Sequence, residues 1–407
     1  MTDKKTHYHV RGSLQHVGGA RATAALALLI GQLPPALAST TRYVNGVSGS
    51  DTNSCASPPT ACKTIGHAIA QSTAGDAVMV AAATYTENIT LAFSLEIIGA
   101  GSANTVIDGG GRASVVDISA TSAHVTLSGV TLTHGTAEWG GGIYNLGTVT
   151  LVSTSVTDNH AFQTGGGIFN LGGTVTINNS TVSSNSASLP NAAASAYGGG
   201  VVNGGTMYIS NSTISGNSAL AYRRFTQYTY ARGGGIYNTH GMYISNSTIS
   251  SNSAFGGFPY YPEGGGIWNS GALLISSSTI AGNQAHVGGI YGGATLHNVI
   301  VANNTSRNCS AAINSAGYNL SSDDSCSLGG PGDLNSTDPK LGTLGNYGGP
   351  TQTIPLLSGS PAIDTGNPSG CTDSQGRLLT TDQRGYPRPD KEDARGCDIG
   401  AYESQSD

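Results

Sequence analysis

The sequence has few charged residues and few aromatic residues. Of its 407 residues, 10% are Asp, Glu, Lys or Arg, and 6% are Phe, Trp or Tyr. No run of basic side chains occurs, which disfavours binding to nucleic acid or to an anionic membrane. No segment has the ~20 consecutive apolar residues that a membrane-spanning helix requires. We therefore predict no nucleic-acid partner and no transmembrane segment.

Glycine, in contrast, is abundant, with 60 copies, while 38% of the residues are hydrophobic and recur in a pattern. This combination favours a packed core over disorder. Much of the glycine lies in one phrase, GGGIYN at 140–145, which returns in close copies starting at residues 165, 198, 233 and 264 and in a worn copy at 288. Three ordered glycines cost conformational entropy. We expect each copy to lie where the backbone turns sharply or where side chains do not fit.

Residues 1–38 have the pattern of a secretory signal peptide. Four basic residues precede the short apolar stretch ATAALALLI at 22–30, and Ala36-Leu37-Ala38 provides a small-x-small cleavage site. An ordinary N-terminal helix is the alternative. Removal of these residues takes away four of the 17 basic and one of the 23 acidic residues, which leaves a net charge of −9. We predict a protein that is secreted or lies on the outer cell surface.

Cysteine is absent from the glycine-rich repeats. An even number of cysteines in an exported chain predicts disulfide bonds. If sequence neighbours pair, the bonds are 55–62, 309–326 and 371–397, which is one of several possible connectivities. No CxxC or clustered Cys/His spacing indicates zinc. The predicted disulfide residues are Cys55, Cys62, Cys309, Cys326, Cys371 and Cys397.

Each glycine phrase is followed by short runs in which apolar residues alternate with polar ones. In TMYISNSTISGNSA at 206–219, the apolar positions are Met207, Ile209 and Ile214. Such runs, rich in Val, Ile and Thr, predict about three short strands in each unit. A unit of about 24 residues with three strands fits one coil of a parallel β-helix. Longer units carry their extra residues just before the next glycine run, which predicts loops on one face.

Equivalent positions in successive units predict three internal ladders, one for each sheet, which together form a continuous core. The first contains Ile143, Ile168, Val201, Ile236, Ile267 and Ile290. The second contains Val149/Leu151, Val175/Ile177, Met207/Ile209, Met242/Ile244 and Leu273/Ile275. The third contains Val156, Val182, Ile214, Ile249, Ile280 and Val301.

Two columns of asparagine mark further corners of the coil. Asparagine tolerates a left-handed backbone and bonds to nearby main chain, and stacked amides can bond from coil to coil. We therefore expect a structural role for them. The columns are Asn145, Asn170, Asn203, Asn238 and Asn269, and separately Asn159, Asn185, Asn217, Asn252, Asn283 and Asn304.

The expected fold is all-β: a right-handed, single-stranded parallel β-helix with an N-terminal cap and an irregular C-terminal domain. Residues 39–120 should contain the cap and the first irregular coils, with a short helix in CKTIGHAIA at 62–70. A cap is needed because the open end of a β-helix is an unpaired edge. Residues 121–306 should form the regular repeats, and residues 307–407 the last coils and the C-terminal domain.

Two resemblances support this assignment. The stretch 43–92 (YVNGVSGSDTNSC…CKTIGHAIA…TYTENITL) and the repeats resemble exported bacterial β-helix proteins of the pectin-lyase-like superfamily, and the GGGIYN phrase resembles polymorphic outer membrane protein repeats. The segments DPKLGTLGNYGGPTQTIPLLSGSPAID, DQRGYPRP and CDIGAYE resemble the choice-of-anchor Q domain. That domain implies surface display. Only SQSD follows Glu403, without a sorting motif or an apolar tail, so simple secretion is the alternative.

Catalytic residues are not evident from the sequence. A lyase of this superfamily would need clustered acids for calcium and a basic residue, and a hydrolase would need paired carboxylates. Within 121–306, the acids Glu138, Asp158 and Glu263 occupy non-equivalent positions. We predict no catalytic residue and no metal site, with a polysaccharide-active enzyme as the alternative. The acid-rich tail either binds Ca²⁺ or forms a solvated cap: Asp364, Asp373, Asp382, Asp390, Glu392, Asp393 and Asp398.

The insertions at 219–232 and 254–263 are rich in aromatic residues. Such a patch can bind glycan or a partner surface, or it can simply cover the sheet. We predict non-catalytic adhesion or glycan binding through these loops and leave the oligomeric state open. The candidate ligand-binding residues are Tyr222, Tyr228, Tyr230, Tyr237, Tyr260, Tyr261 and Trp268. A less favoured alternative uses outward Ser/Thr rows on the third strand, from 155/157 to 279, to order water.

Overall fold

The computed structural model describes residues 39–188, 194–222, 229–256, 261–310, 313–390 and 396–405. The chain divides into two units, 1–38 and 39–407, and the second is described here. The predicted signal peptide therefore lies outside the described residues. Within the described ranges, no helix has the length and apolar character needed to span a membrane.

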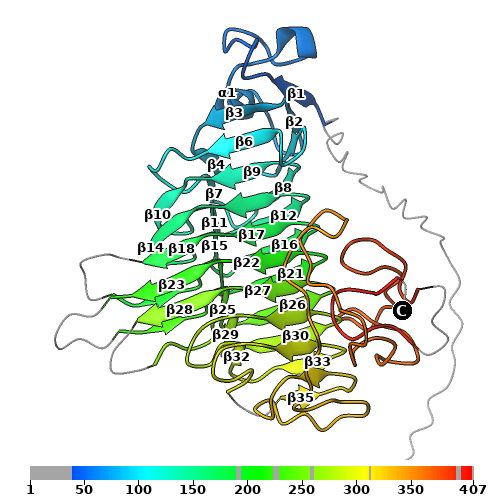
Figure 1. Cartoon of the computed structure of the whole chain (residues 1–407). Helices are drawn as coiled ribbons and strands as arrows, with labels where there is room; N and C mark the ends of the chain where they lie inside the picture. Colours follow the sequence, from blue (N-terminus) through cyan, green and yellow to red (C-terminus); the bar gives the residue numbers. More distant parts are fainter. Residues whose placement is uncertain are drawn as a thin grey trace, which may run out of the picture. The chain divides into compact units, whose positions relative to one another are not determined.

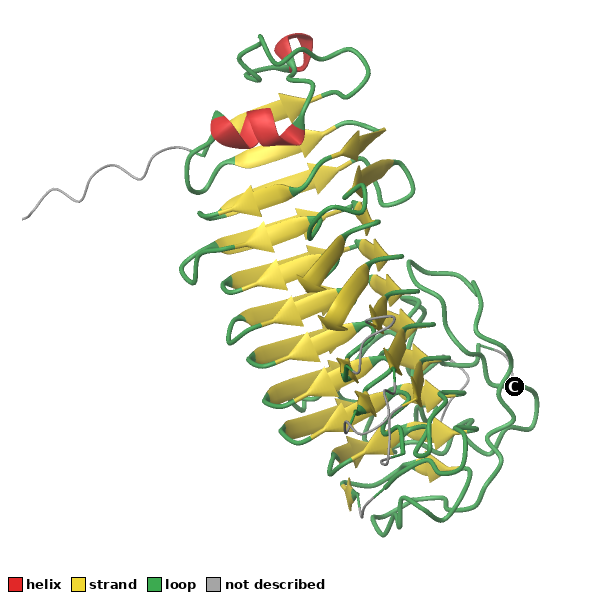
Figure 2. Cartoon of the chain, turned by 90° about the vertical axis from the view of Figure 1, so that its left-hand side faces the viewer, coloured by secondary structure: helices red, strands yellow, loops and turns green. Residues whose placement is uncertain are grey.

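The second unit is a parallel β-helix, as predicted. In one coil, the chain passes from β11 (Ile143–Asn145) to β12 (Thr148–Val152), β13 (Ser155–Thr157) and β14 (His160–Thr164). The equivalent strands of the next coil pair with these in parallel. Successive coils therefore build long sheets whose hydrogen bonds run along the axis of the solenoid, as Figures 1 and 2 show.

Four sheets arise in the described part of the chain, and we name them A to D. The remaining strands of sheet A are β1 (Thr41–Val44), β2 (Ala77–Val80), β5 (Leu95–Gly99), β8 (His124–Ser128), β16 (Thr174–Asn178), β21 (Thr206–Ser210), β26 (Gly241–Ser245), β30 (Ala272–Ser276), β33 (Thr295–His297) and β35 (Asn314–Ser315). The remaining strands of sheet B are β3 (Ala83–Thr86), β6 (Thr105–Asp108), β9 (Thr131–Thr133), β17 (Thr181–Ser183), β22 (Thr213–Ser215), β27 (Thr248–Ser250), β31 (Thr279–Ala281), β34 (Ile300–Ala302) and β36 (Leu320–Ser321).

Sheets C and D complete the coils. The remaining strands of sheet C are β4 (Ile89–Leu91), β7 (Val116–Ile118), β15 (Ile168–Asn170), β20 (Val201–Asn203), β25 (Ile236–Asn238), β29 (Ile267–Asn269) and β32 (Ile290–Tyr291). The remaining strands of sheet D are β10 (Thr136–Trp139), β18 (Ser186–Ser188), β19 (Ala196–Tyr197), β23 (Ser218–Ala221), β24 (Ala231–Arg232) and β28 (Ser253–Gly256). Pairing in sheet A continues across residues 120 and 306, from the coils expected before the repeats to those expected after them.

All three predicted ladders are confirmed. Ile236 pairs with Ile267 in sheet C, Met242 with Leu273 in sheet A, and Ile249 with Ile280 in sheet B. Their side chains are buried in one core that continues from the N-terminal cap to the last coils. Burial of each such side chain stabilises the fold by roughly 1.5–3 kcal/mol.

Each position of the triple-glycine phrase excludes a side chain for its own reason. Gly233 adopts a left-handed backbone with φ of 65°. A Cβ atom on Gly234 would lie 2.3 Å from the main-chain oxygen of Ser253, and one on Gly235 would lie 2.7 Å from that of Gly266. The expected corner, where coils approach too closely for side chains, is therefore confirmed.

The asparagine columns bond from coil to coil, as predicted, but one part of the prediction is wrong. The buried Asn217 donates through Nδ2 to Oδ1 of Asn252 at 2.9 Å and to the Val182 carbonyl at 3.0 Å. The other column repeats this through Asn203 and Asn238. The left-handed residue, however, comes one position earlier and is Gly216 in this coil. The amide is needed to bridge coils, while the turn conformation falls on the preceding residue.

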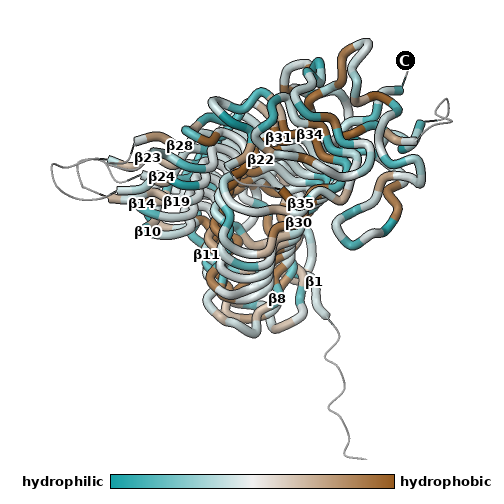
Figure 3. The backbone as a smooth tube through the Cα atoms, turned by 90° about the horizontal axis from the view of Figure 1, so that it is seen from below, coloured by the Kyte–Doolittle hydropathy of each residue, from teal (hydrophilic) through white to brown (hydrophobic). Residues whose placement is uncertain are grey.

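Sheet D was not predicted. Its strands leave the solenoid after sheet B, and the short strands β19 and β24 return just before the glycine phrase. Together they form a wing that projects from one side, seen in Figure 3. Its small core consists of alanines, which lets two layers of backbone approach closely: Ala187, Ala196, Ala219, Ala221, Ala231, Ala254 and Ala285.

The N-terminal end is closed by the predicted helix, α1 (Ile65–Ala70), which lies at the end of the stack in Figure 2. It buries Ile65, Ala68 and Ile69. The carboxylate of Glu87 accepts hydrogen bonds from the N–H groups of Ile65 and Gly66 at the helix N-terminus, where negative charge is stabilising. A short 3₁₀-helix, η1 (Pro58–Thr60), precedes it.

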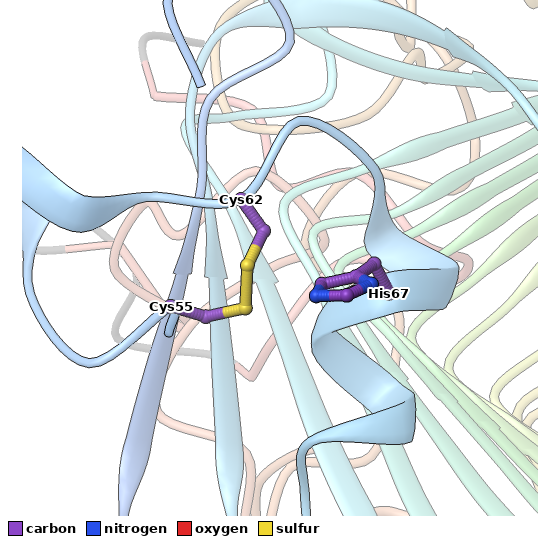
Figure 4. Close-up of side chains that lie close together, drawn as sticks. All are labelled: Cys55, Cys62 and His67. Atoms are coloured by element: carbon purple, nitrogen blue, oxygen red, sulfur yellow. A yellow bond between two sulfur atoms is a disulfide. The ribbon is translucent and has the colours of Figure 1, made fainter. Parts of the chain in front are cut away.

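The cysteines pair as sequence neighbours: Cys55 with Cys62, Cys309 with Cys326, and Cys371 with Cys397. His67 lies beside the first bond (Figure 4), and its ring nitrogen and both sulfur atoms lie within 4.8 Å of one another. Metal ligation requires thiolates. The disulfide bond removes them, so this cluster is structural.

The C-terminal region, residues 322–405, packs on the outer face of sheet B. Gln383 accepts a hydrogen bond from the Thr248 hydroxyl at 2.6 Å and donates to the Thr213 hydroxyl at 2.9 Å. The main-chain N–H of Ala401 donates to Thr279. The outward hydroxyls of β22, β27 and β31 are therefore buried, and the alternative of a water-ordering row fails there.

The acidic side chains of this region have separate structural partners. Asp373 pairs with Arg377, Asp382 pairs with Arg384, and Arg388 forms a fully buried ion pair with Glu403, at 2.6 Å between Nε and Oε2. Asp390 is also buried, and Glu392 and Asp393 lie outside the described residues. Calcium binding in this region stays an untested alternative to the predicted solvated cap.

Asp398 is the acidic residue with the most perturbed environment. It is 1% exposed, and its carboxylate accepts hydrogen bonds from the main-chain N–H groups of Asp364 and Ser404. Burial first, and then repulsion by Glu403, raise the pKa of Asp398 to about 7 from its ordinary value of 3.8.

The first prediction concerns the glycine phrase. Gly234→Ala should lower the free energy of unfolding by about 2 kcal/mol or more, because the new methyl group overlaps the main chain of Ser253. Gly293→Ala is the matched control. No atom lies within 4 Å of its added Cβ, and the change should stay within about 0.5 kcal/mol. Denaturant unfolding of both variants measures this, and equal stability of the two would contradict the packing argument.

The second prediction concerns Asp398→Asn, which mimics the protonated carboxyl. Between about pH 4 and pH 7, the folded state holds a proton at Asp398 that the unfolded state has lost. The contribution of Asp398 to stability is therefore present below about pH 4 and decreases up to about pH 7. Relative to wild type, the variant should gain stability over this range by up to about 1.4 kcal/mol per pH unit.

Thermal unfolding across this pH range measures the difference. Asp373→Asn is the control with opposite sign: burial alone would raise the pKa of Asp373, but hydrogen bonds from Arg377 and Gln375 outweigh it and lower the pKa. Its loss should matter above the ordinary pKa and fade at lower pH. A difference for Asp398→Asn that does not vary with pH would show that this carboxyl does not titrate as described.

Candidate functional site

The outer face of sheet C carries a column of aromatic side chains, one from the centre of each strand. Register places Tyr144 beside Phe169, and Tyr237 between Val202 and Trp268. The column thus runs parallel to the solenoid axis, with neighbours one coil apart, about 4.8 Å. We call it the aromatic column: Tyr144, Phe169, Tyr237, Trp268 and Tyr291, interrupted by Val202.

The rings of the aromatic column stack on one another. The centroids of Tyr237 and Trp268 are 4.4 Å apart, with planes 9° from parallel, and those of Trp268 and Tyr291 are 6.3 Å apart at 8°. Each inner ring therefore covers the faces of its neighbours. What remains for a ligand along this part of the column is ring edges and hydroxyl groups, not open ring faces.

An ion pair lies against the column where the wing joins it. Arg232 Nε is 2.8 Å from Glu263 Oε2, which also accepts a hydrogen bond from Trp268 Nε1 at 3.1 Å. The Arg232 guanidinium lies over the rings of Tyr230, at 4.4 Å, and Trp268, at 5.0 Å. Burial raises the pKa of Tyr237, so its phenol remains a hydrogen-bond donor at neutral pH.

The structure brings together only part of the predicted ligand-binding set. Tyr230, Tyr237 and Trp268 meet around Arg232. Tyr261 is separate and 69% exposed, and it stacks on His286. Tyr222 is half-buried and bridges through its main chain to Ala194. Tyr228 and Tyr260 lie outside the described residues.

A cleft that the sequence did not reveal lies at the N-terminal end of the aromatic column. Asp117 on β7 is the register neighbour of Tyr144 and faces outward from sheet C. The cleft has a volume of about 390 Å³ and lies between sheet C and the wing. Its lining includes Asp117, Arg112, Glu138 and Phe162.

The chemistry of this cleft combines apolar and polar groups. Phe162 is 39% exposed, and Arg112, Glu138 and Asp117 provide hydrogen-bonding groups around it. Oδ1 of Asp117 is buried without a hydrogen-bond partner among the described residues, and burial raises the pKa of this carboxyl. Asp117 and Arg112 were not predicted as site residues because both precede residue 121, where the predicted repeats begin.

Comparisons with known proteins support the fold alone. No protein-family model matches the chain, and no curated protein matches it. Among solved structures, it is similar to pectate lyase Pel9A, with 17% identity, a TM-score of 0.52, and coverage of 90% of this chain and 97% of that one. The complex of XylC with xylose matches with 10% identity, a TM-score of 0.43, and coverage of 89% and 98%. The similarity to pectate lyase Pel9A thus supports the parallel β-helix fold of this chain.

Proposed function

We propose that this protein is a secreted or cell-surface glycan-binding protein and that the ligand lies between sheet C and the wing. The observation that carries the proposal is the cleft of 390 Å³, whose lining combines the exposed ring of Phe162 with the polar side chains of Arg112, Asp117 and Glu138. Sugar rings offer both apolar faces and hydroxyl groups, and a site of this kind combines a ring with convergent polar groups.

The aromatic column extends this site along the solenoid. Its ring edges and the phenols of Tyr144 and Tyr237 continue in register from Asp117. An extended polymer that follows the axis would meet an equivalent side chain at every coil. The wing supplies further exposed aromatic groups, among them Trp139, Phe255 and Tyr261. A repeating ligand therefore suits this face better than a compact one.

Export is part of the proposal. The three disulfide bonds are typical of proteins that fold in an oxidising compartment. They agree with the predicted secretory signal. The C-terminal region, with its resemblance to an anchor domain, is proposed to hold the protein at the cell surface, with simple release as the alternative.

The third prediction tests binding at the cleft. Phe162→Ala should weaken binding of a glycan ligand identified on an array by about tenfold, because the exposed ring is lost. Tyr386→Ala is the control, because Tyr386 is similarly exposed, at 42%, in the C-terminal region. Array binding followed by calorimetry measures the effect. Binding that is unchanged in Phe162→Ala would refute this site.

A second candidate function, glycoside hydrolysis, is favoured by the acid pair of the same cleft. Hydrolysis needs one protonated and one ionised carboxyl group. Burial keeps Asp117 closer to the protonated form, so it would donate its proton to the leaving glycosidic oxygen. Glu138 would accept a proton from the attacking water, whose oxygen forms the new bond to the sugar.

The fourth prediction separates the two functions. If the cleft is catalytic, wild type releases new reducing ends from a polysaccharide, and Asp117→Asn lowers this rate at least about a hundredfold. Glycan binding should survive the substitution because the shape of the side chain is kept. Reducing-end assays on pectin, xylan, galactan and alginate measure it. A wild type that binds but releases nothing leaves binding as the function.

A further inference from the structure

A second groove lies on a different face of the solenoid, between the outer surface of sheet A and the C-terminal region. Its volume is 430 Å³, and its walls come from β16, β21 and β26 on one side and from residues 373–379 on the other. The wing and the C-terminal region lie on different sides in Figure 3. The groove is therefore separate from the cleft of sheet C.

Two tyrosines form the apolar part of this groove. Tyr208 and Tyr243 are register neighbours on β21 and β26, and their rings stack at 5.1 Å with planes 14° apart. The preceding coil places Thr176 beside Tyr208. Because threonine is small, the face of the Tyr208 ring that points toward this coil is not covered by another ring. It is open to a ligand in the groove.

The polar part of the groove has unused hydrogen-bonding capacity. Within the described residues, the hydroxyls of Thr176, Tyr208 and Tyr243 and the side-chain amide of Gln375 have no hydrogen-bond partner. Among the side-chain nitrogens of Arg377, only Nε has a partner in the described part of the chain, and it donates to Asp373 at 2.7 Å. Its terminal amino groups are left for a ligand, and its side chain is 74% exposed.

The charge of the groove is balanced. Burial alone would raise the pKa of Asp373, but hydrogen bonds from Arg377 and Gln375 outweigh it and lower the pKa, so this carboxylate is ionised at neutral pH. It offsets the positive charge of Arg377. The other polar groups of the lining are neutral amides and hydroxyls, including Asn178 and Asn211. Nothing in the described lining selects for an anion.

From this arrangement we infer that the groove is a second saccharide-binding site, specific for a neutral sugar chain. A sugar ring stacks on the open face of Tyr208, and its hydroxyls bond to Gln375, Thr176 and the terminal amino groups of Arg377. The inference goes beyond the proposed function, because it gives the protein two glycan sites on two faces. Such a protein holds two polymer chains together and gains avidity on a polymeric surface.

The fifth prediction tests the groove by calorimetry with neutral hexasaccharides of xylan, galactan and cellulose, and with hexagalacturonate as the acidic probe. Tyr208→Ala with Tyr243→Ala should weaken binding of a neutral probe by about tenfold or more. Arg377→Ala, at an exposed position that cannot disturb the core, should also weaken it, by about threefold to tenfold. Thermal unfolding confirms that the variants are folded.

The outcomes separate this site from the cleft of sheet C. Loss of binding in the groove variants, but not in Phe162→Ala, supports the groove even if the proposed function fails. Loss only in Phe162→Ala overturns the groove and leaves the proposed function intact. A stoichiometry of two in wild type, reduced to one by either variant, supports both. No binding of any neutral probe, or preference for hexagalacturonate, overturns the inference.

Discussion

The structure depends on hydrogen bonds that run along the axis, from each coil to the next. Main-chain pairing in the four sheets accounts for part of them, and buried amides continue the pairing through the corners. In the column through Asn217, each amide accepts from the main chain of the preceding coil and donates to the next amide. A coil that differed in outline would leave such groups buried without partners, at a cost of about 1–3 kcal/mol each. Every coil must therefore repeat the path of its neighbour.

This constraint decides where variation is allowed. Inward positions, corners and glycines are fixed, because a Cβ atom at Gly235 would already overlap the main chain of Gly266 in the next coil. Outward-facing side chains can vary without disturbing the pairing of coils. The segment between the sheet B strand of one coil and the sheet C strand of the next can also vary. The aromatic column and the wing both lie at these permitted places. The alanine core of the wing shows that even an insertion must stay thin where successive insertions stack on one another.

The features predicted from the sequence are those that recur in every coil. The coils are copies of one sequence pattern. The ladders, the glycine corner and the bridging amides could therefore be found by alignment of the coils. The left-handed turn was placed on the asparagine, although it falls on residues as different as Asp158, Ser184 and Gly216. Because these residues differ in type, the sequence does not reveal the position of the left-handed turn. Only the backbone conformation is repeated there from coil to coil.

The missed features are those that occur once. Gln383 accepts a hydrogen bond from Thr248, which lies 135 positions away in the sequence. No periodic pattern predicts such a contact. Asp117 precedes the first recognisable glycine phrase, although it belongs to the same outward column as Tyr144. The orientation of the stacked rings also escaped prediction. A list of aromatic residues indicates a patch, but only the coil spacing shows that the inner rings cover one another and that Tyr208 keeps an open face.

The C-terminal region adds a contact that the solenoid alone cannot make. Arg388, fully buried, reaches from Glu403 to the side chain of Asn246 at a corner of the coil. A buried ion pair of this kind adds little net stability. Loss of one partner, however, destabilises the protein because it leaves the other charge buried and unpaired. Incomplete docking that left Arg388 or Glu403 buried without its partner would therefore be costly. Residues 373–379 form one wall of the groove on sheet A, so the groove exists only when the C-terminal region is docked. A ligand bound in the groove therefore stabilises the docked state.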